Sequence, residues 1–171
     1  MGRRIRCRTS TPEETRAVAA AVAPVMLPGD VVALSGDLGA GKTCFVQGAA
    51  AALGVTDRVT SPSFVLVKEY QGIFPILHLD VYRLSNLQEL TDLGYEEFLD
   101  PRWVVFIEWG DAVGPLLPPS LLEVDIRRGS GEERLIAFHS RGPAWERRLR
   151  EIEHVLAAWD SGNGKAGEEQ S

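Results

Sequence analysis

Eight consecutive residues carry the clearest chemistry in this chain: Gly36-Asp37-Leu38-Gly39-Ala40-Gly41-Lys42-Thr43. They fit the phosphate-binding pattern G-x-x-x-x-G-K-[ST], in which glycines let backbone N–H groups converge on an anion. In such a loop the lysine, here Lys42, reaches the terminal phosphates of a nucleotide, and the hydroxyl, here that of Thr43, binds Mg²⁺. The pattern therefore predicts a nucleotide-binding loop.

A phosphate-binding loop that hydrolyses ATP also needs a carboxylate near the metal ion, usually at the end of a neighbouring apolar strand. Two runs fit this description: residues 76–80 end in Asp80, and residues 104–108 end in Glu108. Spacing alone does not decide which acid contacts Mg²⁺ and which positions the attacking water. The structural alternative for each acid is that it caps the following turn.

Two further features near these acids have two interpretations each, whereas the three histidines have no predicted function. Trp109 follows Glu108 directly, and it either shields the site or contacts a partner, or it is a core aromatic residue at a strand end. Residues 61–64, Ser-Pro-Ser-Phe, form either a switch that senses the γ-phosphate or an ordinary turn. The three histidines, His78, His139 and His154, lack metal-ligand spacing, and we interpret them as structural or surface residues.

The elements on each side of the loop are those that an anion site requires. Residues 31–34 are apolar and β-branched, which predicts a buried strand. Residues 42–53 predict a helix that ends at Gly54. The amino end of such a helix adds partial positive charge next to the loop. The alternative is a glycine turn that only joins a strand to a helix.

The rest of the chain predicts strands and helices in a mixed order. Thr11, Pro12 and Glu14 form a capping box for a helix to Val22. The pattern predicts strands at 4–8, 64–70, 73–82, 103–107, 121–127 and 133–139, and helices at 86–93, 95–99 and 143–159. The last helix should bury Leu149, Ile152, Val155, Leu156 and Trp159 on one face. The expected fold class is therefore α/β, a P-loop NTPase-like mixed sheet flanked by helices, with the nucleotide at the carboxyl end of the loop strand.

Length and composition limit the classes of function. A chain of 171 residues predicts one domain, residues 1–159, followed by a disordered tail at 160–171. A net charge of −6 argues against direct binding of phosphate backbones, so any link to RNA is expected to be indirect. Two cysteines, no signal peptide at residues 2–6 and no membrane-spanning run predict a cytoplasmic protein without membrane contact.

With these pieces in order, the chain resembles the bacterial TsaE family, also called the YjeE-type ATPases, which act in making threonylcarbamoyladenosine on tRNA. The matching stretches are GDLGAGKT at 36–43, SPSF at 61–64, HLDVYRL at 78–84, LGYEEFL at 93–99 and IEW at 107–109. The loop is common to a very large superfamily, but its combination with SPSF, LDVYRL and IEW is far more specific. The resemblance covers roughly residues 9–139.

The resemblance implies a small, Mg²⁺-dependent ATPase that is weak alone. It implies Mg²⁺ held by Thr43 and Glu108, with Asp80 nearby in the metal and water shell, and it makes Lys42, Asp80 and Glu108 the catalytic residues. The implied nucleotide contacts are Gly36, Asp37, Leu38, Gly39, Ala40, Gly41, Lys42, Thr43, Cys44 and Trp109. The implied partners are TsaD and TsaB, the threonylcarbamoyl transferase subunits, with ATP hydrolysis supporting their turnover.

The chain departs from the family pattern at two positions, and three other functions are weighed against it: a small-molecule kinase, a regulatory module and a GTPase. Cys44 replaces the second threonine of the usual GKTT, and Ser63 replaces a frequent threonine. A small-molecule kinase would need a lid, for which Arg147, Arg148 and Arg150 are the candidate arginine cluster. A regulatory module would use nucleotide occupancy to switch a partner surface. A GTPase is disfavoured because the N-K-x-D motif is missing. Residues 11–15 and Arg134 are candidates to contact adenine.

Overall fold

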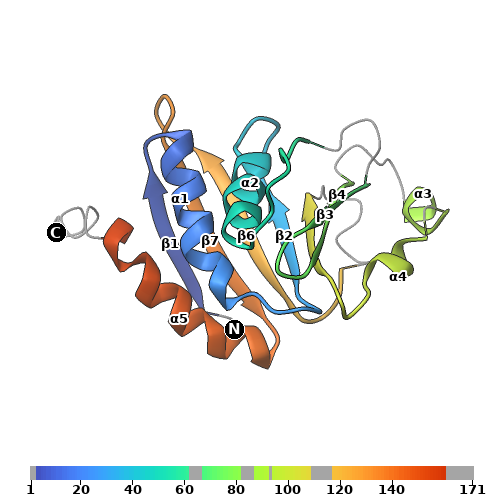
Figure 1. The fold of residues 1–171 in the computed structure, drawn as a ribbon. Coiled ribbons are helices and arrows are strands. Elements are labelled where there is room, and N and C mark those ends of the chain that lie inside the picture. Colours follow the sequence, from blue (N-terminus) through green and yellow to red (C-terminus); the bar gives the residue numbers. More distant parts are fainter. Residues whose placement is uncertain (1–2, 62–66, 82–86, 93, 109–116, 161–171) are drawn as a thin grey trace, which may run out of the picture.

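The computed structural model of the protein describes residues 3–61, 67–81, 87–92, 94–108 and 117–160. Within them, a seven-stranded sheet runs in the order β1-β7-β6-β2-β5-β4-β3 (Figure 1). The strands are β1 Arg4–Thr9, β2 Val31–Ser35, β3 Val67–Gln71, β4 Pro75–Asp80, β5 Val104–Glu108, β6 Leu121–Arg128 and β7 Arg134–Arg141. The four central strands, β6, β2, β5 and β4, are parallel, and the other pairings are antiparallel. This confirms the expected α/β fold with a mixed sheet.

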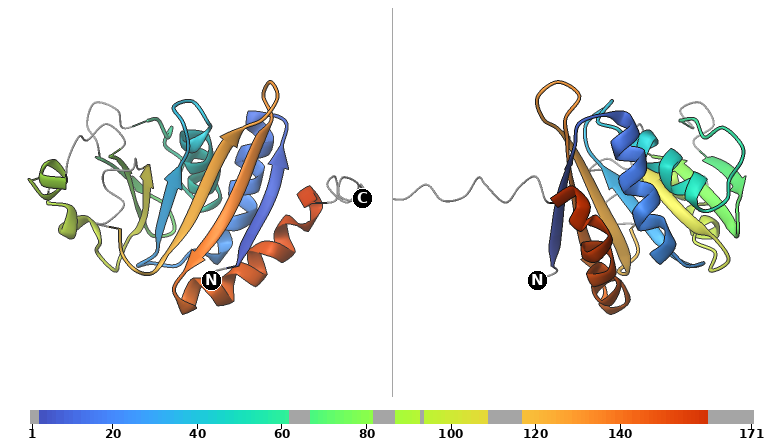
Figure 2. Two further views of the ribbon diagram at one scale, coloured as in Figure 1. Left: turned by 180° about the vertical axis from the view of Figure 1, so that it is seen from behind. Right: turned by 60° about the vertical axis from the view of Figure 1, so that its left-hand side comes forward.

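The described helices are α1 Pro12–Val22, the 3₁₀ helix η1 Ala23–Val25, α2 Lys42–Ala52, α3 Leu87–Asp92, α4 Tyr95–Phe98 and α5 Pro143–Asp160. Helices α1, α2 and α5 cover one face of the sheet, called here the front face (Figures 1 and 2). The expected cap of α1 is present, since the Thr11 hydroxyl accepts a hydrogen bond from the Glu14 N–H at 3.2 Å. The Glu14 carboxylate accepts from Ser10 N–H at 2.6 Å, one residue before the position that a capping box uses.

The alternation of side chains along the strands divides the core into two layers. On the front face, Val32 and Leu34 of β2 pack with Phe45 of α2 and Phe138 of β7. Burying a phenylalanine completely contributes about 1.5–3 kcal/mol to stability. On the opposite, rear face, a second cluster around Ile107 is covered by residues from the 98–117 region: Phe98, Leu99, Trp103 and Leu117. This cover lies over the half of the sheet that carries β2, β5 and β4.

Helix α5 is fixed to the sheet by packing and by an ion pair. The guanidinium group of Arg148 donates two hydrogen bonds to the Asp30 carboxylate, at 2.5 and 2.9 Å. Asp30 is the residue just before β2. The predicted apolar face of α5 was wrong at Val155, which is 36% exposed. The buried side chains are Trp145, Leu149, Ile152 and Leu156, and their spacing of four, three and four residues leaves Val155 beside the stripe.

The strand and helix predictions are otherwise confirmed to within a few residues wherever the structure describes them. The strands β3 and β4 form one antiparallel hairpin, and β6 and β7 form another. Helix α5 continues through Asp160, the first residue assigned to the tail, and the predicted tail beyond it lies outside the described residues. None of the described helices has the length and apolar character that crossing a membrane demands.

Candidate nucleotide-binding site

The loop 36–43 leaves the carboxyl end of β2 and enters α2 in a conformation that depends on glycine. Gly36 and Gly41 have φ angles of 138° and 112°, in the region that L side chains rarely adopt. A Cβ atom at Gly36 would also lie 2.2 Å from the Ile126 carbonyl oxygen of β6. Gly41 is the N-cap of α2, so the first N–H groups of an eleven-residue helix face the loop.

Lys42 lies inside this loop rather than on the surface. Its side chain is 6% exposed, and its ammonium group donates a hydrogen bond to the Gly36 carbonyl oxygen at 2.7 Å. The positive charge is therefore held over the concave side of the loop, next to the amino end of α2. A buried ammonium group together with a helix amino end favours a negatively charged ligand.

Glu108, the last residue of β5, contacts the loop directly. It is 4% exposed, and its Oε1 accepts a hydrogen bond from the Thr43 hydroxyl at 3.2 Å. Its Oε2 lies 2.8 Å from Nε2 of His78, a fully buried residue of β4. The carboxylate is thus held between a hydroxyl and an imidazole, and its orientation is fixed from both sides.

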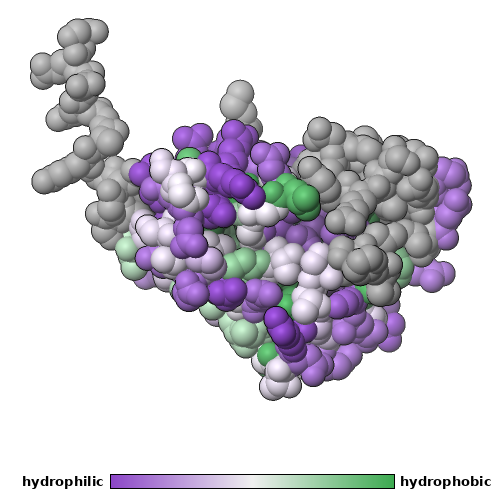
Figure 3. Space-filling view, turned by 90° about the horizontal axis from the view of Figure 1, so that it is seen from above, coloured by the Kyte–Doolittle hydropathy of each residue, from purple (hydrophilic) through white to green (hydrophobic). Residues whose placement is uncertain are grey.

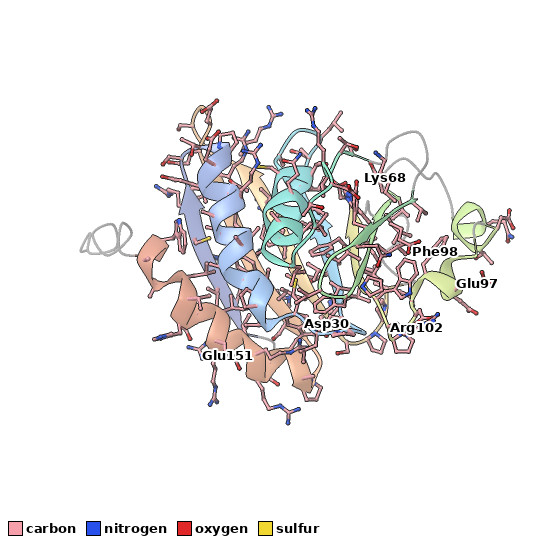
Figure 4. The ribbon with its side chains drawn as sticks, in the orientation of Figure 1. Asp30, Lys68, Glu97, Phe98, Arg102 and Glu151 are labelled. Atoms are coloured by element: carbon pink, nitrogen blue, oxygen red, sulfur yellow. The ribbon has the colours of Figure 1, made fainter. Side chains whose placement is uncertain are left out.

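Asp80 lies beside Glu108 because β4 and β5 are parallel and in register at these two residues. The alternation of strand side chains puts Ile76 and His78 on the front face, and Asp80 follows two residues later. A cavity of about 190 Å³ opens here, lined by Leu38, Gly39, Gly41, Lys42, Thr43, Cys44, Ser61, Asp80 and Glu108. In Figure 4, Lys68 marks the end of the sheet near this cavity, whereas Asp30 and Arg102 lie at the other end. Seen from the cavity end, the described surface is mostly hydrophilic (Figure 3).

The cavity brings together the residues that the sequence nominated as metal ligands: Thr43, Asp80 and Glu108. In the described part of the chain, no group of three or more His, Cys, Asp or Glu side chains is arranged to hold a metal ion. Two carboxylates and a hydroxyl fit Mg²⁺ that is bound together with a nucleotide, because Mg²⁺ commonly takes one or two carboxylates and completes its shell with phosphates and waters.

Two arginines of the β6–β7 hairpin hold the loop from outside, and sequence reasoning did not assign them this role. Arg128 donates a hydrogen bond to the Leu38 carbonyl oxygen at 3.2 Å, and Arg134 donates to the Ala40 carbonyl oxygen at 2.9 Å. Arg134 was a candidate for contact with adenine, and its described hydrogen bonds are to backbone carbonyls. About ninety residues separate each arginine from its partner in the sequence. The contacts depend on the parallel pairing of β2 with β6, which the sequence pattern does not contain.

The other nominated residues have different outcomes. Trp109 and residues 62–64 lie outside the described residues, whereas Ser61 lines the cavity. His78 is buried as a structural histidine would be, but its contact with Glu108 was not anticipated. The signal that could have revealed it is the spacing of two residues between His78 and Asp80 on one strand. His154 is exposed, as expected for a surface residue.

Cys44 replaces a hydroxyl residue at the cavity and takes part in holding α2 to α1. Its thiol lies 3.2 Å from the Pro12 carbonyl oxygen and donates a hydrogen bond to it. Burial raises the pKa of the Cys44 thiol above its usual value, and the charge of Arg16 opposes this rise. The side chain is therefore a neutral thiol near pH 7, and it brings no negative charge to the amino end of α2.

Comparisons with known proteins agree with this arrangement. The model of the family "Threonylcarbamoyl adenosine biosynthesis protein TsaE" matches residues 9–136. A relative from Bacillus subtilis (strain 168), named tRNA threonylcarbamoyladenosine biosynthesis protein TsaE, is 41% identical over 151 residues, which are 88% of this chain and 94% of that protein. A relative of the same name from Treponema pallidum (strain Nichols) is 38% identical over 123 residues, which are 72% and 91% of the two chains.

A solved structure extends the similarity to three dimensions. The crystal structure of Bacillus subtilis YdiB superposes with a TM-score of 0.78 and 38% sequence identity, over 90% of this chain and 97% of that chain. The matched region of the family model contains the loop, Asp80 and Glu108, so the cavity lies wholly within it. Because the family model matches residues 9–136 and the relatives match most of the chain's length, the chain belongs to the TsaE family.

Proposed function

We propose that this protein is a Mg²⁺-dependent ATPase that serves the synthesis of threonylcarbamoyladenosine on tRNA. The observation that carries the proposal is the cavity that collects Lys42, Thr43, Asp80 and Glu108 at the amino end of α2. The place in tRNA modification rests on the names of the relatives, which describe threonylcarbamoyladenosine biosynthesis proteins.

In this proposal each residue has a task that its chemistry allows. Lys42 neutralises charge on the β- and γ-phosphates, and the N–H groups at the start of α2 donate to phosphate oxygens. Thr43 and Glu108 would hold Mg²⁺, with Asp80 close by, and the ion would supply positive charge that stabilises the leaving ADP. Asp80 or Glu108 orients the attacking water. His78 keeps the Glu108 carboxylate in position.

The direct test is ATP turnover by the wild-type protein and by Lys42→Ala. The variant should lose ATP hydrolysis while it retains the circular dichroism spectrum of the wild type, because the loop's charge is removed and the core is untouched. Arg102→Ala, which removes one positive charge at the far end of the sheet, is the matched control and should hydrolyse ATP normally. Full turnover by Lys42→Ala would contradict the proposal.

We further propose that the partners are TsaD and TsaB, and that the protein reaches tRNA through them. ATP hydrolysis should then rise when both purified transferase subunits are added. An unchanged rate would remove the partner assignment and leave the ATPase assignment in place.

A nucleotide-switched binding module is the second candidate. The observation that favours it is the pair of hydrogen bonds from Arg128 and Arg134 to loop carbonyls, because they couple the loop to a hairpin that extends beyond the cavity. The transferase subunits would then bind with different affinities in the presence of ATP, of ADP and of no nucleotide. Equal affinity in all three states would eliminate the switch.

A further inference from the structure

Among the residues that the structure describes, no helix covers the rear face of the sheet over β1, β7 and β6. In the view from behind, these three strands lie in front of α1 and α2 (Figure 2, left). The side chains of β1 alternate strictly: Ile5, Cys7 and Thr9 are buried on the front face, whereas Arg4, Arg6 and Arg8 are exposed. Two consecutive rear-face positions of a strand are about 6.8 Å apart, so the three guanidinium groups start from a regular row.

This row borders a shallow cavity of about 390 Å³ on the rear face. The cavity is lined by Arg4, Arg6, Cys7, Arg8, Asp125, Arg127, Leu135, Ile136 and Ala137. The lining holds four arginines and one aspartate, a net charge of +3 on a chain whose net charge is −6. We call the set Arg4, Arg6, Arg8 and Arg127 the arginine face.

The charges of the arginine face are only partly neutralised within the chain. The Asp125 carboxylate serves both Arg127, at 2.9 Å, and Arg4, at 3.5 Å. Arg8 lies 3.8 Å from Glu133. The Arg6 backbone pairs with β7, but its guanidinium forms no hydrogen bond or ion pair with the described residues. Like charges on neighbouring positions of a sheet repel one another, so this face gains stability when acidic groups bind to it.

The floor of the cavity indicates which kind of acidic partner fits. Leu135, which is 39% exposed, and the small Ala137 lie between the arginines of β1 and Arg127 of β6. Apolar residues ringed by arginine are typical of protein interfaces. The lining contains no aromatic residue, and binding of single-stranded nucleic acid relies on aromatic residues that stack with bases. Guanidinium groups bind carboxylates in bidentate fashion, and the face therefore suits Asp and Glu side chains of a protein.

The arginine face is also connected to the candidate nucleotide loop, residues 36–43. Ser35, the last residue of β2 and the neighbour of Gly36, donates a hydrogen bond to the Asp125 carboxylate at 3.3 Å. Arg127 precedes Arg128, which holds the Leu38 carbonyl oxygen. An acidic group that competes with Asp125 for the arginines therefore acts on residues directly joined to the loop.

We propose that the arginine face docks an acidic segment of a partner protein, and that this docking is felt at the nucleotide loop through Asp125 and Ser35. The inference rests on the proposed function for the existence of a protein partner. It differs from that function in assigning the docking to the rear face of β1, β7 and β6 and to carboxylates of the partner.

The test uses a charge reversal that breaks no described ion pair. Arg6→Glu should weaken binding of the purified TsaD and TsaB subunits about tenfold or more, and the wild-type affinity should fall as salt is raised. Arg150→Glu on the exposed side of α5 makes the same charge change and should bind like the wild type. Both variants should hydrolyse ATP at the basal rate without partners, because neither residue lines the cavity that contains Lys42, Asp80 and Glu108. Arg6→Lys, which keeps the charge but loses the bidentate fork, should fall between the wild type and Arg6→Glu.

Each other outcome has a definite meaning. Equal binding of wild type, Arg6→Glu and Arg150→Glu overturns the docking face and leaves the proposed function intact. If the wild type binds neither subunit, the partner part of the proposed function fails, and poly-L-glutamate becomes the probe of the face. Binding of poly-L-glutamate that Arg6→Glu abolishes supports the face, and its absence overturns the face. Binding of a tRNA transcript that depends on Arg6 would show a nucleic-acid surface and would also overturn the inference.

Discussion

At the scale of single residues, the site depends on how Glu108 is held. A carboxylate that is 4% exposed pays a desolvation cost that its hydrogen bonds must offset. Thr43 and His78 each bind one of its oxygens, so the side chain cannot rotate without losing both partners. His78 thereby acts as a positioning residue for the acid, since it supports Glu108 and does not line the cavity.

Replacing His78 should reveal this positioning role. His78→Phe keeps the volume but removes the group that binds Glu108, and we expect kcat to fall by about 10–100-fold. His78→Gln can place an amide N–H near the same oxygen and should recover part of that loss. The Mg²⁺ concentration that gives half-maximal ATPase activity should rise in His78→Phe more than in His78→Gln. A stability loss without any change in kcat or Mg²⁺ dependence would leave His78 a purely structural residue.

At the scale of elements, the packing of α1 against α2 sets the position of the loop helix. The two helices meet at Gly48, where a Cβ atom would lie 2.2 Å from the Arg16 carbonyl oxygen. The atom that this Cβ would meet belongs to the backbone of α1, so it cannot move aside as the end of a flexible side chain could. Glycine here lets α2 lie close enough to α1 for Cys44 to bind the Pro12 carbonyl oxygen.

Gly48→Ala separates helix propensity from packing. In an exposed helix this change would stabilise by about 1 kcal/mol, but the clash with Arg16 should reverse the sign and destabilise the protein by about 2 kcal/mol. Chemical denaturation measures the difference. Ala51→Gly, at an exposed position of the same helix, is the comparison and should cost about 1 kcal/mol. A Gly48→Ala variant more stable than the wild type would mean that α1 and α2 separate without cost.

The elements were more predictable from sequence than the contacts between them. The loop, the capping of α1 by Thr11 and the strands that end at Asp80 and Glu108 follow from local patterns, which sequence periodicity records directly. The contacts of His78 and Arg128 depend on strand order and register, which no local pattern contains. The prediction that Val155 is buried was wrong because a period of 3.6 residues fits several apolar stripes on a long helix. Only the tertiary packing selects one of them.

At the scale of the whole molecule, the two sides of the sheet have different tasks. The front face is covered by α1, α2 and α5 and holds the candidate nucleotide cavity at one end. The rear face is apolar and covered over β2, β5 and β4, but over β6, β7 and β1 it is charged and no described helix covers it. The sheet therefore separates a candidate reaction site from a candidate docking surface, with the loop in contact with both.

Nucleotide binding should stabilise the whole fold because the loop connects β2 to α2 at the centre of the molecule. A ligand that binds the folded state alone adds about 2.7 kcal/mol at about 100 times its Kd. We therefore expect Mg²⁺ and ATP together to raise the Tm by several degrees in a thermal shift assay. Removing Mg²⁺ with a chelator should reduce the shift, and Lys42→Ala should abolish it. An unchanged Tm across all nucleotide concentrations would argue that the cavity binds no nucleotide.

The place of β1 at the edge of the sheet has one more consequence. An edge strand presents unpaired N–H and C=O groups, and a second copy of the chain can pair with them and begin to aggregate. Two β1 strands paired in this way would bring Arg4, Arg6 and Arg8 of one copy next to the same row of the other. The repulsion between these rows opposes self-association, so the arginines protect the free protein from its own exposed edge until their charges are neutralised.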